Sequence, residues 1–98
     1  MPRVVHVRDR VPGAVFIGRP GPFGNPFIIG RHGTRADVIK LYRQMITRYT
    51  DTATSLREKV RRELAGKDLA CFCAPLPCHG DVLLEIANTT QSSNIEQN

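Results

Sequence analysis

Glycine and proline interrupt the chain most strongly between residues 18 and 33, where the sequence reads GRPGPFGNPFIIGRHG. This stretch holds five glycines and three prolines, a density that neither a helix nor a regular strand tolerates. Its apolar residues Phe23, Phe27, Ile28 and Ile29 argue against a plain linker. We therefore expect a structured loop, with a short extended piece at residues 26–29, that separates an N-terminal region of strands from a C-terminal region with helices.

The residues before this loop favour β-structure. A short β-branched run covers residues 3–7, and a second apolar run covers residues 14–18. The Pro12-Gly13 step between them is a turn signal. It predicts that the two strands form a hairpin or lie next to each other.

A helix is predicted after the loop, from residue 34 to about residue 49. Thr34 can cap its first turn, and Asp37, three residues later, completes a variant of the capping box. Apolar residues recur at spacings of three and four, which gives the helix one apolar face for packing against the strands. This face comprises Val38, Leu41, Tyr42, Met45, Ile46 and Tyr49.

The remaining sequence predicts a second helix, a buried strand and a third helix. Residues 55–65 carry apolar residues at helical spacing and end before Gly66, a suitable C-cap. Residues 68–73 are short and apolar, as in a central strand, and residues 81–87 (DVLLEIA) predict the last helix. Residues 89–98 are polar and predict a flexible C-terminal tail.

These elements predict an α+β (or small α/β) fold, in which a short sheet of about three to four strands packs against about three helices. A chain of 98 residues can bury only one hydrophobic core, so we expect a single-layer core in one globular domain at residues 1–88. A bound metal would help to stabilise so small a domain.

The charge and hydropathy of the chain limit which kinds of binding partner are expected. A net charge of +5 and a sequence pI of about 9.6 favour anions, including nucleic acid, but the basic residues are scattered and form no disordered arm. The N-terminus lacks the apolar stretch of a signal peptide, and no apolar run is long enough to cross a membrane. We therefore expect a cytoplasmic protein with no membrane partner.

Four soft or borderline metal ligands, Cys71, Cys73, Cys78 and His79, lie within nine residues. An odd number of cysteines in so short a window is a poor disulfide framework, whereas four such ligands suit a tetrahedral zinc site. Cys71 and Cys73 are two apart on the predicted strand and so point to the same face. The following loop could fold Cys78 and His79 back over them, although this spacing is rarer than a pair of cysteines separated by two to four residues. We predict a zinc site, or a site for another thiophilic metal, at these four residues.

Other interpretations of the cluster remain open. Its cysteines could be small buried residues of the core, as free cysteines often are. Cys78 could instead be a reactive thiol, because it directly precedes a predicted helix, with His79 and Asp81 as the nearest catalytic partners. Asp81 could equally cap that helix or orient His79. His6 or His32 could replace a ligand that points away from the metal.

Polar residues in and after the glycine-rich loop predict a ligand site. Loops of this kind and helix N-termini present backbone N–H groups to anions. The sequence matches neither the dinucleotide fingerprint nor the P-loop pattern, and its prolines lack donors, so a purely structural loop is equally open. The candidate ligand-binding residues are Gly18, Arg19, Gly24, Asn25 and Arg35.

The motifs GRPGPFGNPF and GKDLACFCAPLPCHGDVLLE, in this order and with the helix around Tyr42 between them, resemble a family of small bacterial and phage proteins catalogued as domain of unknown function 4326. The resemblance runs from about residue 15 to residue 87. It implies that both motifs contribute to one site, and that a phage-encoded copy would act in the host cytoplasm. The residues it places together are Gly18, Arg19, Gly24, Asn25, Pro26 and Phe27 with Cys71, Cys73, Cys78, His79 and Gly80.

Two functions are consistent with these features. The first is a small zinc-bearing protein that binds, or acts on, a nucleotide-type or other anionic ligand; an open zinc position would polarise a carbonyl or activate a water, and one of the four ligands would then be free of the metal. The second is a non-catalytic phage or bacterial accessory protein that binds nucleic acid or a host protein through its basic faces, such as Arg57, Arg61 and Arg62, while the cysteine cluster is purely structural. The sequence does not decide whether the protein is an enzyme.

Overall fold

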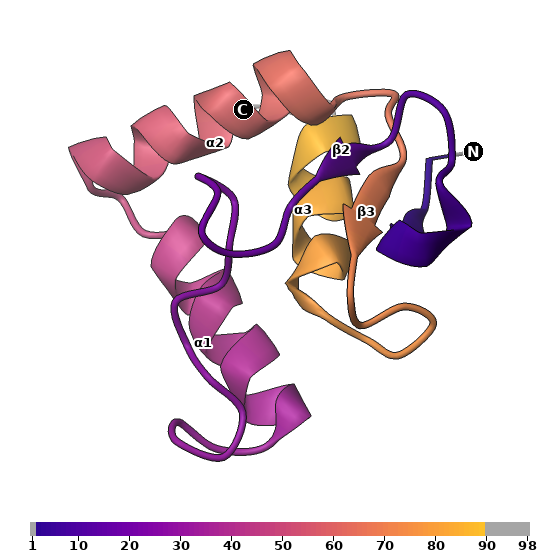
Figure 1. Cartoon of the computed structure of the whole chain (residues 1–98). Coiled ribbons are helices and arrows are strands. Elements are labelled where there is room, and N and C mark those ends of the chain that lie inside the picture. Colours follow the sequence, from indigo (N-terminus) through magenta and orange to yellow (C-terminus); the bar gives the residue numbers. More distant parts are fainter. Residues whose placement is uncertain (1, 90–98) are drawn as a thin grey trace.

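The computed structural model describes residues 2–89, which form a small α+β fold, as predicted (Figure 1). Two short strands open the chain, β1 (Val4–His6) and β2 (Val15–Phe16), with a 3-10 turn at Val7–Asp9 between them. The helices α1 (Arg35–Ile46) and α2 (Asp51–Leu64) follow, and then β3 (Leu69–Cys71) and α3 (His79–Asn88). Of the predicted tail at residues 89–98, all but Thr89 lies outside the described residues.

The three strands form one sheet in the order β1-β3-β2, with both outer strands parallel to β3. Val4 and Val15 are both paired with Leu69, on opposite sides of the central strand. The central position of β3 is as predicted, but both expectations for β1 and β2 are wrong: they form no hairpin, because they run in the same direction, and they are not neighbours, because β3 separates them. The short, wholly apolar β3 gains more burial between two strands than at an edge.

The capping residues define where each helix begins. The Thr34 side chain accepts the Asp37 N–H at 3.2 Å, and the Asp37 carboxylate accepts the Thr34 N–H at 2.9 Å, so the predicted capping box is confirmed. These two hydrogen bonds with Thr34 lower the pKa of Asp37. Helix α1 ends earlier than predicted, and Tyr49 is fully exposed. Helix α2 begins earlier than predicted because the Thr50 side chain caps it, and Gly66, with φ of 75°, follows its C-cap.

The core lies where the helices meet one face of the sheet. Helix α3 packs against α1, α2, β1 and β3 and is therefore central to it (Figure 1). Gly80 in its first turn permits the close approach, since a Cβ there would lie 2.8 Å from a Val4 methyl and 2.9 Å from an Ile17 methyl. The fully buried large side chains are Tyr42, Ile17, Ile46, Leu64, Leu69, Leu83, Val60 and Val82.

No helix among residues 2–89 is both long enough and apolar enough to cross a membrane.

The Arg57 side chain on α2 binds the C-terminal end of α1. Its guanidinium donates to the carbonyl oxygens of Ile46 and Arg48, both at 2.7 Å, and to the Thr54 hydroxyl at 3.1 Å. These carbonyls have no helical partner of their own, so a cation at this end of α1 is favourable. Arg57 therefore joins two helices, whereas Arg61 and Arg62 remain exposed on α2.

Replacing Arg57 by alanine is expected to lower the free energy of unfolding by about 1–2 kcal/mol, because hydrogen bonds to a charged donor are lost from a partly exposed site. Arg61→Ala on the same helix is the matched control and should change it by less than about 0.5 kcal/mol. Urea unfolding of both variants measures the difference. Equal stability of the two variants would contradict the role given to Arg57.

Candidate functional site

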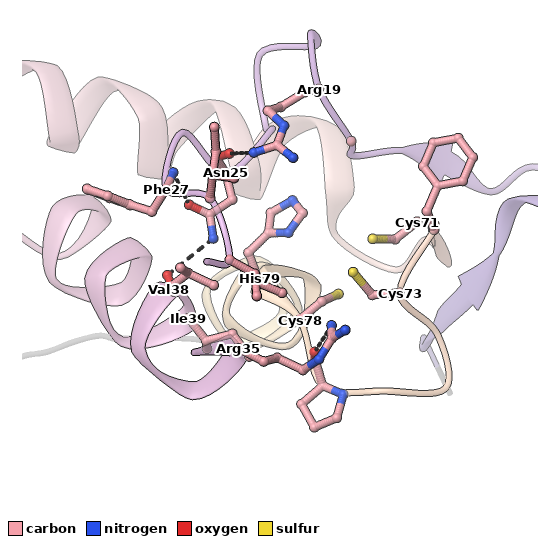
Figure 2. A pocket seen from close by; sticks show the side chains of 15 residues that line it. Arg19, Asn25, Phe27, Arg35, Val38, Ile39, Cys71, Cys73, Cys78 and His79 are labelled. Atoms are coloured by element: carbon pink, nitrogen blue, oxygen red, sulfur yellow. Dashed lines mark hydrogen bonds between the residues drawn. The ribbon is translucent and has the colours of Figure 1, made fainter. Parts of the chain in front are cut away.

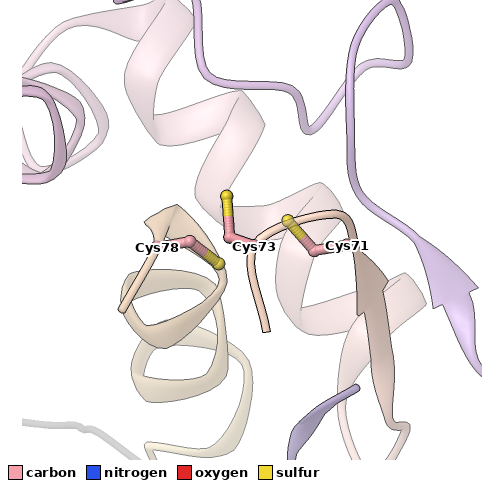
Figure 3. A group of neighbouring side chains, drawn as sticks. All are labelled: Cys71, Cys73 and Cys78. Atoms are coloured by element: carbon pink, nitrogen blue, oxygen red, sulfur yellow. The ribbon is translucent and has the colours of Figure 1, made fainter. Parts of the chain in front are cut away.

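The three cysteines lie together at one end of the sheet (Figure 3). Cys71 is the last residue of β3, Cys73 follows in the loop, and Cys78 is the N-cap of α3. Their sulfur atoms all lie within 4.8 Å of one another, and all three are free thiols. Cys71 and Cys78 are buried, and Cys73 is half-buried. The three cysteines could therefore bind a metal ion.

This arrangement fits the chemistry of a thiophilic metal. Tetrahedral zinc with Zn–S bonds of about 2.3 Å holds its sulfurs roughly 3.8 Å apart, so the thiols need to approach by no more than about 1 Å. The three come from a strand, a loop and a helix N-terminus, and the half-buried Cys73 can move with its loop. Three protein ligands leave the fourth tetrahedral position open.

The cysteines also act on one another electrostatically. A hydrogen bond from Cys78 lowers the pKa of Cys71, and the same hydrogen bond, together with burial, raises the pKa of Cys78. The lowered pKa of Cys71 favours its thiolate, which is the form that binds metals. The interpretation of Cys78 as an activated nucleophile is not favoured, although its sulfur does accept the Gly80 N–H at 3.3 Å.

His79 does not belong to this group of sulfur atoms. Its Nε2 lies 2.8 Å from the carbonyl oxygen of Ile17, its ring packs edge-on against Tyr42 at 5.1 Å, and it is 6% exposed. Figure 2 shows the ring between the guanidiniums of Arg19 and Arg35, with the sulfur atoms of Cys71 and Cys73 to one side of it. Cys78 and His79 separate because successive helical residues point about 100° apart.

The other residues considered near the cluster have structural roles. The Asp81 carboxylate accepts the Cys78 N–H at 3.2 Å and completes a capping box, so capping is its role. The Nδ1 atom of His6 accepts the Arg8 N–H at 3.1 Å, and that of His32 accepts the Ile28 N–H at 2.8 Å. Neither His6 nor His32 joins the three sulfurs.

A pocket of about 330 Å³ lies beside the sulfur atoms (Figure 2). It brings the glycine-rich loop, the first turns of α1 and the cysteine loop together. The sequence-predicted residues that line it are Gly18, Arg19, Asn25, Phe27, Arg35, Cys71, Cys73, Cys78 and His79. Gly24, Pro26 and Gly80 do not line it. No carboxylate is among its lining residues.

Asn25 fixes the glycine-rich loop against α1. It is 9% exposed, its amide nitrogen donates to Val38 O at 3.2 Å, and its side-chain oxygen accepts the Phe27 N–H at 2.9 Å. The Tyr42 hydroxyl donates to Phe23 O at 3.0 Å and anchors the same loop from the core. Two hydrogen bonds therefore hold the loop against α1, and its residues 26–29 form no strand.

The two arginines of the pocket come from different elements. Arg19 donates to Asn25 O at 3.0 Å, and Arg35, in the first turn of α1, donates to Pro77 O at 3.1 Å. Each guanidinium has five N–H donors, so most remain available to an anion. Arg35 also connects α1 to the cysteine loop across 42 residues of sequence.

Apart from Phe27, the apolar wall of the pocket is the part that the sequence did not assign to a site. Phe72 was predicted to lie in a buried strand but is 67% exposed. The alternation that turns Cys71 and Cys73 inward turns Phe72 outward, which is the signal that could have identified it. The apolar lining residues are Phe27, Ile28, Ile29, Val38, Ile39 and Phe72.

The family described as Domain of unknown function (DUF4326) matches residues 4–89. The chain belongs to this family. In this DUF4326 protein the match includes β1, the helices α1 to α3 and all the residues that line the pocket. It begins at residue 4, whereas the resemblance carried by the two motifs begins at about residue 15.

A phage relative supports the same assignment to DUF4326. The uncharacterized 12.4 kDa protein in the nrdA-td intergenic region of Enterobacteria phage T4 is 29% identical over 68 residues. The aligned part is 69% of this chain and 62% of the phage protein, so less than two thirds of that relative is spanned. No solved structure matches the chain.

Proposed function

We propose that this protein is a zinc-bearing, ligand-binding protein in which Cys71, Cys73 and Cys78 hold the metal and its fourth position faces the adjoining pocket. The observation that carries this proposal is the approach of three sulfur atoms to within 4.8 Å on the wall of that pocket. A purely structural zinc site has four protein ligands, whereas a site that meets a ligand keeps one position open.

The charges around the pocket support an anionic ligand. Arg19 and Arg35 both line it, and no carboxylate does. A zinc ion bound by three thiolates carries a net negative charge, so the acid group of a ligand would bind the guanidiniums rather than the metal. An uncharged atom of the ligand, such as a carbonyl oxygen, is better suited to the open position.

The walls and size of the pocket support an organic anion, of which nucleotide-type molecules are one class. Its volume of about 330 Å³ lies near the lower end of the range of roughly 300–1,000 Å³ for small-molecule sites. Isoleucine and phenylalanine side chains form much of the lining. An inorganic anion would leave this apolar surface uncovered.

When bound, zinc in such a site supplies a Lewis acid that can polarise a carbonyl or activate a water. The protein's own residues would position the ligand and exclude water from it. General acid or base catalysis by a carboxylate is not part of the proposal, because Asp81 caps α3 and Asp68 accepts the Arg3 N–H at the far end of β3.

The proposal predicts near-stoichiometric zinc in protein purified without added metal or chelator, and a lower melting temperature after chelation. Elemental analysis identifies the metal, and a thermal melt with and without chelator measures its effect. If the analysis finds another thiophilic metal, the metal named in the proposal is wrong and the three-cysteine site still holds. Protein that contains no metal, takes up none on addition of zinc and has three freely titrating thiols would overturn the proposal.

A further inference from the structure

The hydrogen bond between His79 and Ile17 determines which ring nitrogen carries the proton. Nε2 lies 2.8 Å from the Ile17 carbonyl oxygen, and a carbonyl can only accept, so Nε2 must be the donor. In the neutral imidazole the other nitrogen, Nδ1, then presents a lone pair and can only accept. A neutral His79 therefore presents one specific acceptor atom rather than two interchangeable nitrogens.

This acceptor is buried without a partner inside the protein. The His79 side chain lies in the core at 6% exposure and lines the pocket, yet no residue between 2 and 89 forms a hydrogen bond with Nδ1. Buried polar atoms in native proteins are almost always paired. The missing donor is thus expected to come from whatever occupies the pocket.

The remaining pocket residues restrict what that occupant can be. In Figure 2 the guanidiniums of Arg19 and Arg35 lie on opposite sides of the His79 ring, so an acid group and a donor can be bound by one small molecule. The apolar wall at Ile28, Ile39 and Phe72 requires a carbon framework between them.

We propose that Nδ1 of His79 accepts a hydrogen bond from the ligand, so that the pocket selects small organic anions with an N–H or O–H donor close to the acid group. This inference rests on the proposed ligand-binding function and makes its substrate class more specific. His79 is the residue that determines specificity, while Arg19 and Arg35 provide the affinity for any acid.

Two probes of nearly the same shape test this selection. Pyrrole-2-carboxylate and furan-2-carboxylate are both flat five-membered-ring acids, but the first has a ring N–H next to the carboxylate and the second has an oxygen there. Titration calorimetry with the zinc-loaded full chain should show that the pyrrole acid binds at least about tenfold more tightly, because an unpaired buried acceptor is costly.

The variant His79→Gln tests the contribution of Nδ1 to ligand binding. A glutamine side-chain nitrogen can reach the position of Nε2 and donate to Ile17 O, but no glutamine atom replaces Nδ1. The ratio of the affinities for the pyrrole acid and the furan acid should fall to about one in His79→Gln. Arg35→Gln should weaken both acids and leave their ratio as in the wild type. Zinc content and a thermal melt of each variant establish that the fold and the metal site persist.

The outcomes separate this inference from the proposed function. A preference for the pyrrole acid that disappears in His79→Gln supports the inference. Equal binding of the two acids overturns it but leaves a pocket for anions. Loss of zinc from His79→Gln would identify Nδ1 as a metal ligand, which overturns the inference and keeps the metal. Binding of neither acid overturns both the inference and the ligand-binding part of the proposed function, whatever the zinc content.

Discussion

Replacement of Cys73 by serine is expected to weaken zinc binding by more than about a hundredfold, because loss even of residues that only orient a metal ligand costs 10–100-fold. Cys73 is the most suitable of the three for this experiment. It is half-buried and lies in the loop after β3, whereas Cys71 and Cys78 are buried in the core. A serine at residue 73 should therefore remove a ligand with little direct effect on packing.

The measurement is a competition for zinc between the protein and a chromophoric chelator of known affinity. A hundredfold loss of affinity corresponds to about 2.7 kcal/mol of ligand-dependent stability, or a melting temperature lower by roughly 10–20 °C at saturating zinc. With excess chelator the wild type and Cys73→Ser should melt at the same temperature, because the difference between them is bound metal.

His79→Gln is the matched control for the same competition. It changes the fourth residue of the sequence-predicted set, which lies outside the group of three sulfurs and whose ring contacts Ile17 and Tyr42. Its zinc affinity should stay within about tenfold of the wild type. If Cys73→Ser bound zinc as tightly as the wild type, the three-sulfur site would be wrong.

The sequence could predict that the three cysteines lie together, but it could not predict that the His79 ring contacts Ile17 and Tyr42. Alternation along a strand turns Cys71 and Cys73 to one face, and a thiol just before a helix can turn back towards them as an N-cap. His79 is the first residue of α3, and helical rotation carries its side chain away from that of Cys78. Its carbonyl partner, Ile17, is 62 residues away, and no local pattern predicts such a contact.

In the fold, too, features set by neighbouring residues could be predicted, and features set by residues far apart in the sequence could not. The capping box at Thr34 and Asp37 is local and could be predicted, as could the central strand at residues 69–71. The order of the strands could not, because the turn at Pro12-Gly13 is equally compatible with a hairpin and with a crossover. The choice depends on β3, which comes more than 50 residues later and lies between the two strands.

Prediction of the pocket would have required both local sequence patterns and tertiary contacts. Arg19, Asn25 and Arg35 could be proposed as ligand residues because they lie near a loop and a helix N-terminus. Their position beside the cysteines depends on how the loop packs against α1, which is a tertiary contact made by Asn25 and Tyr42. The side chain of Asn25 therefore has more influence on the site than its exposed neighbours do.

Asn25→Ala should lower the free energy of unfolding by about 2–4 kcal/mol, one of the largest effects of a single polar substitution in this chain. The alanine removes the acceptor for the Phe27 N–H and the donor to Val38 O, both in a site that is 9% exposed. Val38 O can keep its helical partner, so most of the cost comes from the unpaired Phe27 N–H and from the space left by the amide.

Two further variants show whether this cost comes from the hydrogen bonds. Asn25→Asp keeps an acceptor for Phe27 but places a carboxylate against Val38 O, so it should remain destabilised even though it is nearly isosteric. Gln44→Ala, at an exposed position of α1, should change stability by less than about 0.5 kcal/mol. Urea unfolding measures the free energy of unfolding of the three variants and shows whether the cost comes from the hydrogen bonds of Asn25. If Asn25→Ala were as stable as Gln44→Ala, the loop would be held by Tyr42 and apolar packing alone, and Asn25 would be available to bind a ligand instead.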